Sequence, residues 1–205
     1  RALGATRSVI REMFEYGKKR KSEIGDVNVF DFSIGNPSVP SPGEVNESLI
    51  RLLTESDPVA LHGYTSAQGD AGVRTALSDY INTTYGDNVS ANDFYLTVGA
   101  AASLTVTLTA LLNEGDEVIL IAPFFPEYRV FVERTGANVV IVDSEKDTFQ
   151  PDIQKIEAAF TERTRAIIVN YPNNPTGAIM TREDLEEIAE VLRGTNIMVL
   201  SDEIY

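Results

Sequence analysis

The chain has 205 residues, of which 43% are apolar, enough for one substantial core or for one domain and part of another. Its 31 acidic against 17 basic residues give a net charge of −14, which disfavours nucleic acids and anionic lipid surfaces as partners. The absence of cysteine excludes a disulfide framework and a thiolate metal site, and no run of about 18 apolar residues predicts a membrane helix.

The N-terminal stretch is charged throughout and has no apolar core of the kind that signal peptides carry, so we expect a cytoplasmic protein. Ile10, Met13 and Phe14 recur at helical spacing, and residues 29–34 predict a short extended segment. Prolines then exclude a helix up to Pro42. The next apolar patterns predict two helices, over residues 44–55 and 71–85.

From Phe94 onward, short apolar runs alternate with amphipathic helical patterns. The runs are continuous rather than alternating, as strands covered on both faces should be. This order predicts an α/β fold with a mainly parallel sheet and helices on both faces. The predicted strands are 94–98, 118–121, 139–142, 166–169 and 197–200, and the predicted helices are 101–112, 127–134, 153–160 and 182–193.

In such sheets, ligands bind beyond the carboxyl ends of the strands, so the loops there are the candidate site. Residues 99–103 are small and open a helix, which suits phosphate or simply tight packing of a helix on the sheet. After the next strand, one of Phe124 and Phe125 is placed to enter the core and the other to face the cleft, unless both are core.

Two further strand ends carry polar residues. The loop 170–177 contains two prolines and three asparagines, which is typical of a stiff hydrogen-bonding turn and also of an ordinary one. Asp202 emerges from a buried strand, which is costly unless the carboxylate meets a cation or a donor, although it could also cap the next helix. Tyr205 adds a second polar group three residues later.

Together these loops resemble the pyridoxal-phosphate (PLP) dependent aminotransferases of fold type I, class I/II. The motifs that carry the resemblance are Asn173-Asn174-Pro175-Thr176-Gly177, Ser201-Asp202-Glu203-Ile204-Tyr205, Ser33-Ile34-Gly35-Asn36-Pro37, and Gly63-Tyr64 with Gly69. The resemblance covers nearly the whole chain. It implies a small-domain segment or N-terminal arm over residues 1–40 and an incomplete PLP-binding large domain over 41–205.

The resemblance also implies a role for each matching residue. Asp202 would pair with the pyridine nitrogen of PLP, and Phe125 would stack on the ring. Asn174 and Tyr205 would hydrogen-bond the phenolate oxygen of PLP, with Asp202 and Tyr205 as the catalytic pair. The backbone N–H groups of Ala100, Ala101 and Ala102 would hold the phosphate. Gly35 and Asn174 would lie at the substrate, and Tyr64 would reach the phosphate of a neighbouring subunit, which implies a homodimer; no metal is implied.

The same resemblance places a Schiff-base lysine some tens of residues beyond Tyr205. The lysines at 18, 19, 21, 146 and 155 do not follow a strand near Asp202, so we expect this N-terminal portion to be inactive alone. The expected reaction of the parent enzyme moves an amino group between an amino acid and a 2-oxo acid. The alternatives are a PLP-dependent β-lyase or related enzyme of the same fold, the aminotransferase-like domain of a transcription regulator, and a non-catalytic binding module.

Overall fold

A computed structural model describes residues 9–35 and 39–205 of the chain. Two compact units, Arg1–Thr65 and Ser66–Tyr205, divide the chain. The predicted domain boundary near residue 40 stays a prediction. Among the described helices, none combines the length and the apolar character that crossing a membrane requires.

The first unit is helical in its described parts. Asp31 ties its extended segment to helix α1: the carboxylate accepts hydrogen bonds from Ser33 N and Oγ, at 3.1 and 2.6 Å, and pairs with Lys21 Nζ at 3.0 Å. The sequence did not predict the short helix α3, which Asp57 caps by accepting from Ala60 N at 2.8 Å. The elements of this unit are α1 (Val9–Ile24), η2 (Asp26–Asn28), α2 (Gly43–Glu55) and α3 (Pro58–His62).

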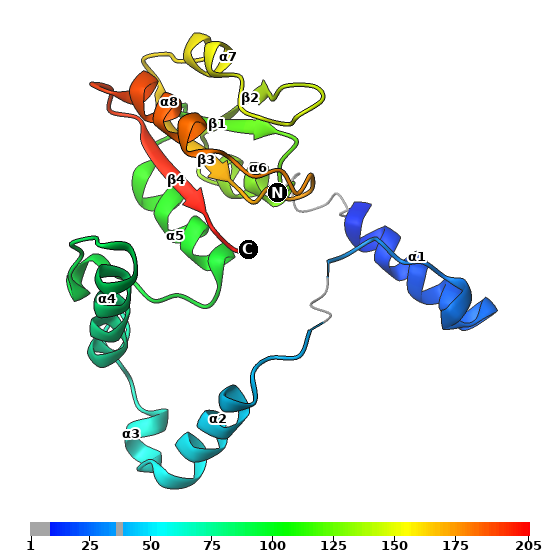
Figure 1. Cartoon of the computed structure of the whole chain (residues 1–205), viewed down its shortest axis with the longest axis vertical. Helices are drawn as coiled ribbons and strands as arrows, with labels where there is room; N and C mark the ends of the chain where they lie inside the picture. The colour runs from blue at the N-terminus through cyan, green and yellow to red at the C-terminus, as the bar shows by residue number, and fades with distance from the viewer. Residues whose placement is uncertain (1–8, 36–38) are drawn as a thin grey trace. The chain divides into compact units, whose positions relative to one another are not determined.

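The second unit alternates strands and helices after two leading elements (Figure 1). The boundaries differ by no more than two residues from those that the sequence predicts, because continuous apolar runs mark the buried part of each strand. Its elements are α4 (Ala71–Tyr85), η3 (Ala91–Asp93), α5 (Ala100–Leu111), β1 (Glu117–Ala122), α6 (Glu127–Glu133), β2 (Asn138–Asp143), α7 (Ile153–Ala158), β3 (Thr164–Asn170), α8 (Arg182–Leu192) and β4 (Met198–Asp202).

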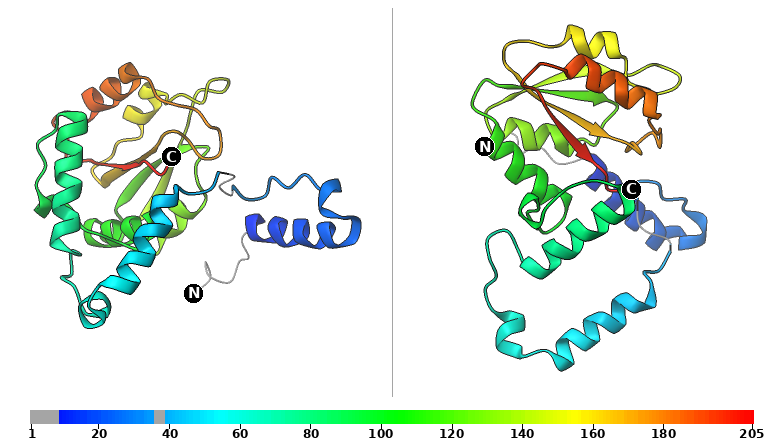
Figure 2. Two further views of the ribbon diagram at one scale, coloured as in Figure 1. Left: turned by 60° about the horizontal axis from the view of Figure 1, so that its bottom comes forward. Right: turned by 60° about the vertical axis from the view of Figure 1, so that its left-hand side comes forward.

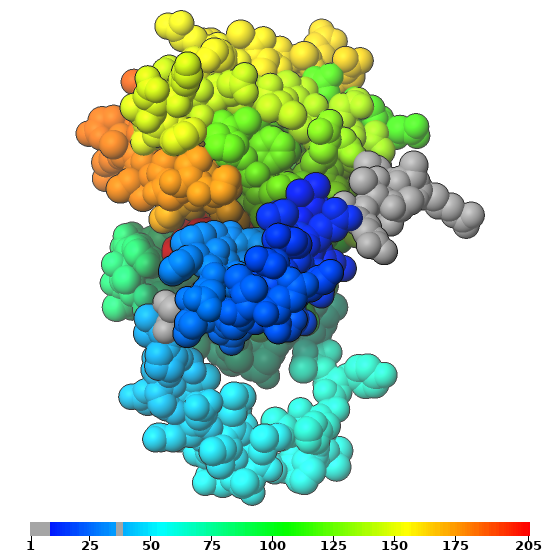
Figure 3. Space-filling view, turned by 90° about the vertical axis from the view of Figure 1, so that its right-hand side faces the viewer, coloured from blue at the N-terminus to red at the C-terminus, as the bar shows by residue number. Residues whose placement is uncertain are grey.

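The four strands form one parallel sheet in the order β2-β1-β3-β4. Side chains of α5 and α6 pack on one face, in a core that includes Leu108 and Tyr128. Side chains of α7 and α8 pack on the other, in a core that includes Ile156 and Ile188. Figure 2 shows these helices on both sides of the sheet, and Figure 3 shows the second unit's green, yellow and orange segments in contact. The predicted fold class is confirmed.

One predicted strand is wrong. Residues 94–98 have the composition of a strand but pair with none of the four strands that the structure describes. Leu96 N donates instead to Gln68 O at 2.9 Å. A strand exists only where a neighbour exchanges backbone hydrogen bonds with it, and the local sequence does not carry that information.

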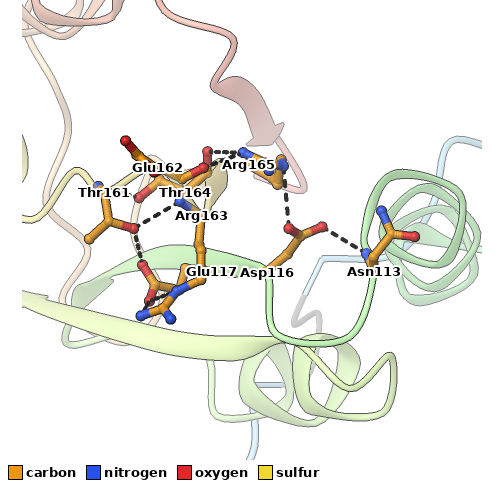
Figure 4. Close-up of polar contacts among 8 residues, drawn as sticks. All are labelled: Asn113, Asp116, Glu117, Thr161, Glu162, Arg163, Thr164 and Arg165. Atoms are coloured by element: carbon orange, nitrogen blue, oxygen red, sulfur yellow. Dashed lines mark hydrogen bonds and ion pairs between the residues drawn. The ribbon is translucent and has the colours of Figure 1, made fainter.

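A polar network closes the amino ends of the strands, opposite their carboxyl ends (Figure 4). Glu117 is 7% exposed, and its carboxylate accepts from Thr161 Oγ1 at 2.6 Å and pairs with Arg163 at 2.9 Å. Beside it, Asp116 pairs with Arg165 at 3.3 Å and accepts from Asn113 N at 2.8 Å. These contacts satisfy two nearly buried carboxylates and fix the loop that leads into β1.

Candidate active site at the carboxyl edge of the sheet

Asp202 is the last residue of β4 and is held by two hydrogen bonds. Its carboxylate Oδ2 accepts from Tyr128 Oη at 2.7 Å, and its backbone oxygen accepts from Asn170 Nδ2 at 2.9 Å. Asn170 ends β3 and is the Cα partner of Asp202 in the parallel ladder. The carboxylate therefore has the donor that its position at the end of a buried strand requires.

Tyr128 supplies that donor from helix α6. Its side chain is only 2% exposed. Burial, and next the hydrogen bond to Asp202 and the negative charge there, raise the pKa of the phenol well above its ordinary value of 10. The phenol is therefore protonated at neutral pH and can donate its hydrogen to Asp202.

Phe125 lies beside this pair. Its ring makes an edge-to-face contact with Tyr128, with centroids 5.6 Å apart and planes at 83°. Both Phe124 and Phe125 are partly buried against the core on the α5 and α6 face, but only Phe125 lines the pocket described below. We expected one ring in the core and the other in the cleft. In the structure both rings touch the core, and Phe125 also lines the pocket.

The loop after β3 is braced by Asn173. Its buried carboxamide oxygen accepts from Thr176 N and Oγ1, at 3.1 and 2.8 Å, and its nitrogen donates to the backbone oxygens of Pro123 and Asn170, each at 3.3 Å. The side chain of Asn174, in contrast, is free within the described ranges. Its backbone N–H donates to Asn170 Oδ1 at 3.0 Å, whereas its side chain hydrogen-bonds no other described residue and lines the pocket.

Helix α5 begins at the same edge. Gly99 precedes it with φ 82° and ψ 165°, a backbone conformation that is essentially restricted to glycine. In the first turn of α5, Ala102 N already donates to Gly99 O at 3.1 Å. The N–H groups of Ala100 and Ala101 have no partner among the described residues. A helix start with free N–H groups favours an anion such as phosphate.

A pocket of about 250 Å³ brings these residues together. It contains six of the predicted cofactor contacts, whereas Ala102 lies outside its lining. The lining consists of Ala100, Ala101, Leu104, Phe125, Tyr128, Phe131, Asn170, Asn174, Asp202, Ile204 and Tyr205.

The remaining predicted site residues belong to the first unit. The side chain of Tyr64 is fully exposed within that unit, and the space around Gly35 is open. Asn36 and Pro37, which complete the motif that begins at Ser33, lie outside the described residues. The roles of Gly35 and Tyr64 therefore stay predictions.

Sequence reasoning assigned no role to Tyr128 or Asn170. A signal existed for Asn170, which ends an apolar strand as Asp202 does. For Tyr128 the only hint was its place one helical turn after Phe125. No group of three or more His, Cys, Asp and Glu side chains in the described ranges is arranged to hold a metal ion.

The chain is similar to several known proteins. The model of the family described as aminotransferase class I and II matches residues 27–205. A solved amino transferase structure from Eubacterium rectale is 46% identical, with a TM-score of 0.95, over 99% of this chain and 53% of its own. The aspartate aminotransferase of Pyrococcus horikoshii is 34% identical over 100% of this chain and 50% of its own length. The glutamate-pyruvate aminotransferase of Escherichia coli is 35% identical over 91% of this chain and 46% of its own length. The chain thus spans about half the length of these relatives.

Proposed function

This chain belongs to the class I and II aminotransferase family, and we propose that the whole protein is a PLP-dependent aminotransferase that moves an amino group between an amino acid and a 2-oxo acid. The observation that carries this proposal is the composition of the pocket. It combines a carboxylate with a fixed donor, an aromatic ring, a free carboxamide and the start of a helix.

The pocket residues fit PLP group by group. Asp202 offers a carboxylate oxygen to a protonated pyridine nitrogen, and Phe125 offers a ring face to a flat heterocycle. Ala100 and Ala101 offer free N–H groups to a phosphate, with Ala102 behind them in the first turn of α5. The free side chains of Asn174 and Tyr205 are the candidates to hydrogen-bond the phenolate oxygen.

When bound, PLP supplies a cationic ring that accepts the electron pair released at the substrate's α-carbon. The chain's own residues prepare the pocket for that chemistry. The carboxylate of Asp202 stabilises a proton on the ring nitrogen, and Tyr128 keeps the carboxylate in one orientation by donating to Oδ2. Phe125 and Leu104, both partly buried, add apolar surface beside these polar groups, which strengthens their interactions.

Substrate class is less closely defined than reaction class. The named relatives are an aspartate aminotransferase and a glutamate-pyruvate aminotransferase, which favours amino-group transfer over the β-lyase alternative and leaves the particular acid open. A homodimer with Tyr64 reaching across, a role for Gly35 beside the substrate, and a cytoplasmic location stay predictions for the whole protein.

The test uses Asp202→Asn in the whole protein. We expect weaker PLP binding in an absorbance titration and a fall of about 10²-fold or more in kcat, because the pocket loses the charge that stabilises the ring proton. Asp143→Asn is the matched control, since Asp143 also ends a strand but lies outside the pocket lining. Unchanged PLP binding and transfer in Asp202→Asn would refute the proposed role of this pocket.

A further inference from the structure

The carboxamide of Asn170 joins the two segments that carry the proposed contacts to the cofactor ring. Its nitrogen donates to the backbone oxygen of Asp202 at 2.9 Å, and its oxygen accepts from the backbone nitrogen of Asn174 at 3.0 Å. The residue is 5% exposed, so water has little access to these bonds. One buried side chain therefore holds both the end of β4 and the loop that follows β3.

This link lies where the backbone ladder stops. Asn170 and Asp202 are the last Cα partners of β3 and β4, and beyond them no further pairing is described between the two segments. Asn174 lies four residues past the end of β3, in a loop that also bonds to Pro123, to Phe149 through Tyr171 and to Gln150 through Ile179. Among the described hydrogen bonds, those of the Asn170 side chain are the ones that join the backbones of Asn174 and Asp202 directly.

We infer that Asn170 is a positioning residue that sets the span between the carboxylate of Asp202 and the carboxamide of Asn174. This inference rests on the proposed function, in which these two groups contact two different atoms of one rigid ring system, the pyridine nitrogen and the phenolate oxygen. A rigid ligand gains from both contacts only when their separation matches its own width. Asn170 does not need to touch the ligand's reacting atoms to act in this way.

Asparagine is the side chain that meets this requirement. It has a donor and an acceptor on one planar group, and both are used here. Aspartate would keep the acceptor for Asn174 N but would direct an oxygen at the backbone oxygen of Asp202. Serine would be too short to reach both partners. Each change removes a defined part of the link and leaves most of the surroundings in place.

The experiment compares Asn170→Asp and Asn170→Ser with the wild-type whole protein in two binding measurements. One is the dissociation constant for PLP, from absorbance titration. The other is the competition constant of inorganic phosphate, which probes the start of α5 and has no ring. We expect PLP binding to weaken about tenfold or more in both variants. Phosphate binding should stay within about twofold of wild type, because the described hydrogen bonds of the Asn170 side chain run to Asp202 and Asn174 and not to Ala100 or Ala101.

Asn138→Asp is the matched control, since Asn138 is exposed and begins β2 at the opposite edge of the sheet. It should bind both ligands as the wild type does. Wild-type PLP affinity in both Asn170 variants would refute the inference alone. An equal loss of PLP and phosphate binding would show a merely structural role and would also refute it. A wild-type protein that does not bind PLP would refute the proposed function, and the inference with it.

Discussion

The phenol of Tyr128 offers a direct test of how the carboxylate of Asp202 is held. Tyr128→Phe removes one oxygen and leaves the edge-to-face contact with Phe125 in place. The lost interaction is the 2.7 Å hydrogen bond from Oη to Asp202 Oδ2. The substitution therefore separates the polar contribution of the residue from its packing.

The structure sets the expected magnitude. A hydrogen bond to a charged group contributes about 1.5–3 kcal/mol. Asp202 is partly exposed, so water can replace the phenol at the carboxylate, and we expect the lower end of that range. A loss of about 1.4 kcal/mol corresponds to roughly tenfold weaker PLP binding. Absorbance titration of the whole protein measures it, with Tyr95→Phe, an exposed tyrosine of the same unit, as the control.

The same substitution changes the response to alkali. Because the folded-state pKa of Tyr128 is raised above 10, its contribution to stability is complete below pH 10 and is lost as the pH rises beyond it. The wild type should therefore lose free energy of unfolding above about pH 10 more steeply than Tyr128→Phe does. PLP affinity and alkaline stability in Tyr128→Phe that match those of Tyr95→Phe would refute this account.

Three further predictions concern other parts of the chain. Phe125→Ala should weaken PLP binding, measured by titration, with about 0.5–1.5 kcal/mol from lost stacking and more from lost burial. Glu117→Gln should lower the free energy of unfolding by about 1–3 kcal/mol in urea denaturation, because the amide cannot replace the carboxylate toward Arg163 (Figure 4). Asp31 should titrate in carboxyl NMR at a pKa of about 2, because Ser33 and Lys21 donate hydrogen bonds to its carboxylate. Its contribution to stability is therefore lost as the pH falls from about 4 to about 2. Ser33→Ala should raise the pKa of Asp31 toward 3.8.

Each of these predictions has a control or a contradicting result. Phe124→Ala should leave PLP binding closer to wild type than Phe125→Ala does, since Phe124 is not in the pocket lining. Arg182→Ala removes an exposed ion pair with Glu186 and should change stability by less than about 0.5 kcal/mol, unlike Glu117→Gln. An Asp31 pKa near 3.8 in the wild type would contradict the hydrogen bonds described for that segment.

The sequence predicts the sheet well because burial on both faces leaves a local trace. The runs 118–121, 139–142 and 166–169 lie inside observed strands, and 197–200 begins one residue before β4. It fails at 94–98, where composition favours a strand and no described strand pairs with it. It also misses α3, although Asp57 followed by Pro58 is a pattern typical of a helix start.

The site is predictable in a different way. Parallel strands end at one edge of a sheet, and this argument placed the loop 170–177 and Asp202 in one candidate site. The partners of Asp202 could not be found by the same argument. Tyr128 is 74 residues away in the chain, and its phenol reaches Asp202 only because α6 packs across the sheet. A contact of that kind depends on packing and has no local sequence pattern.

The two partners of Asp202 restrain different movements of that residue. Asn170 holds the backbone oxygen and so fixes where the end of β4 lies, whereas Tyr128 holds Oδ2 and so fixes how the carboxylate is turned. Within the described chain, β4 pairs only with β3, and Met198 and Val199 are about half exposed. Backbone pairing therefore restrains β4 from one side alone. A carboxylate at the end of such a strand needs both side-chain hydrogen bonds to present its free oxygen in one fixed direction, and the loss of either should reduce ring binding by a separate route.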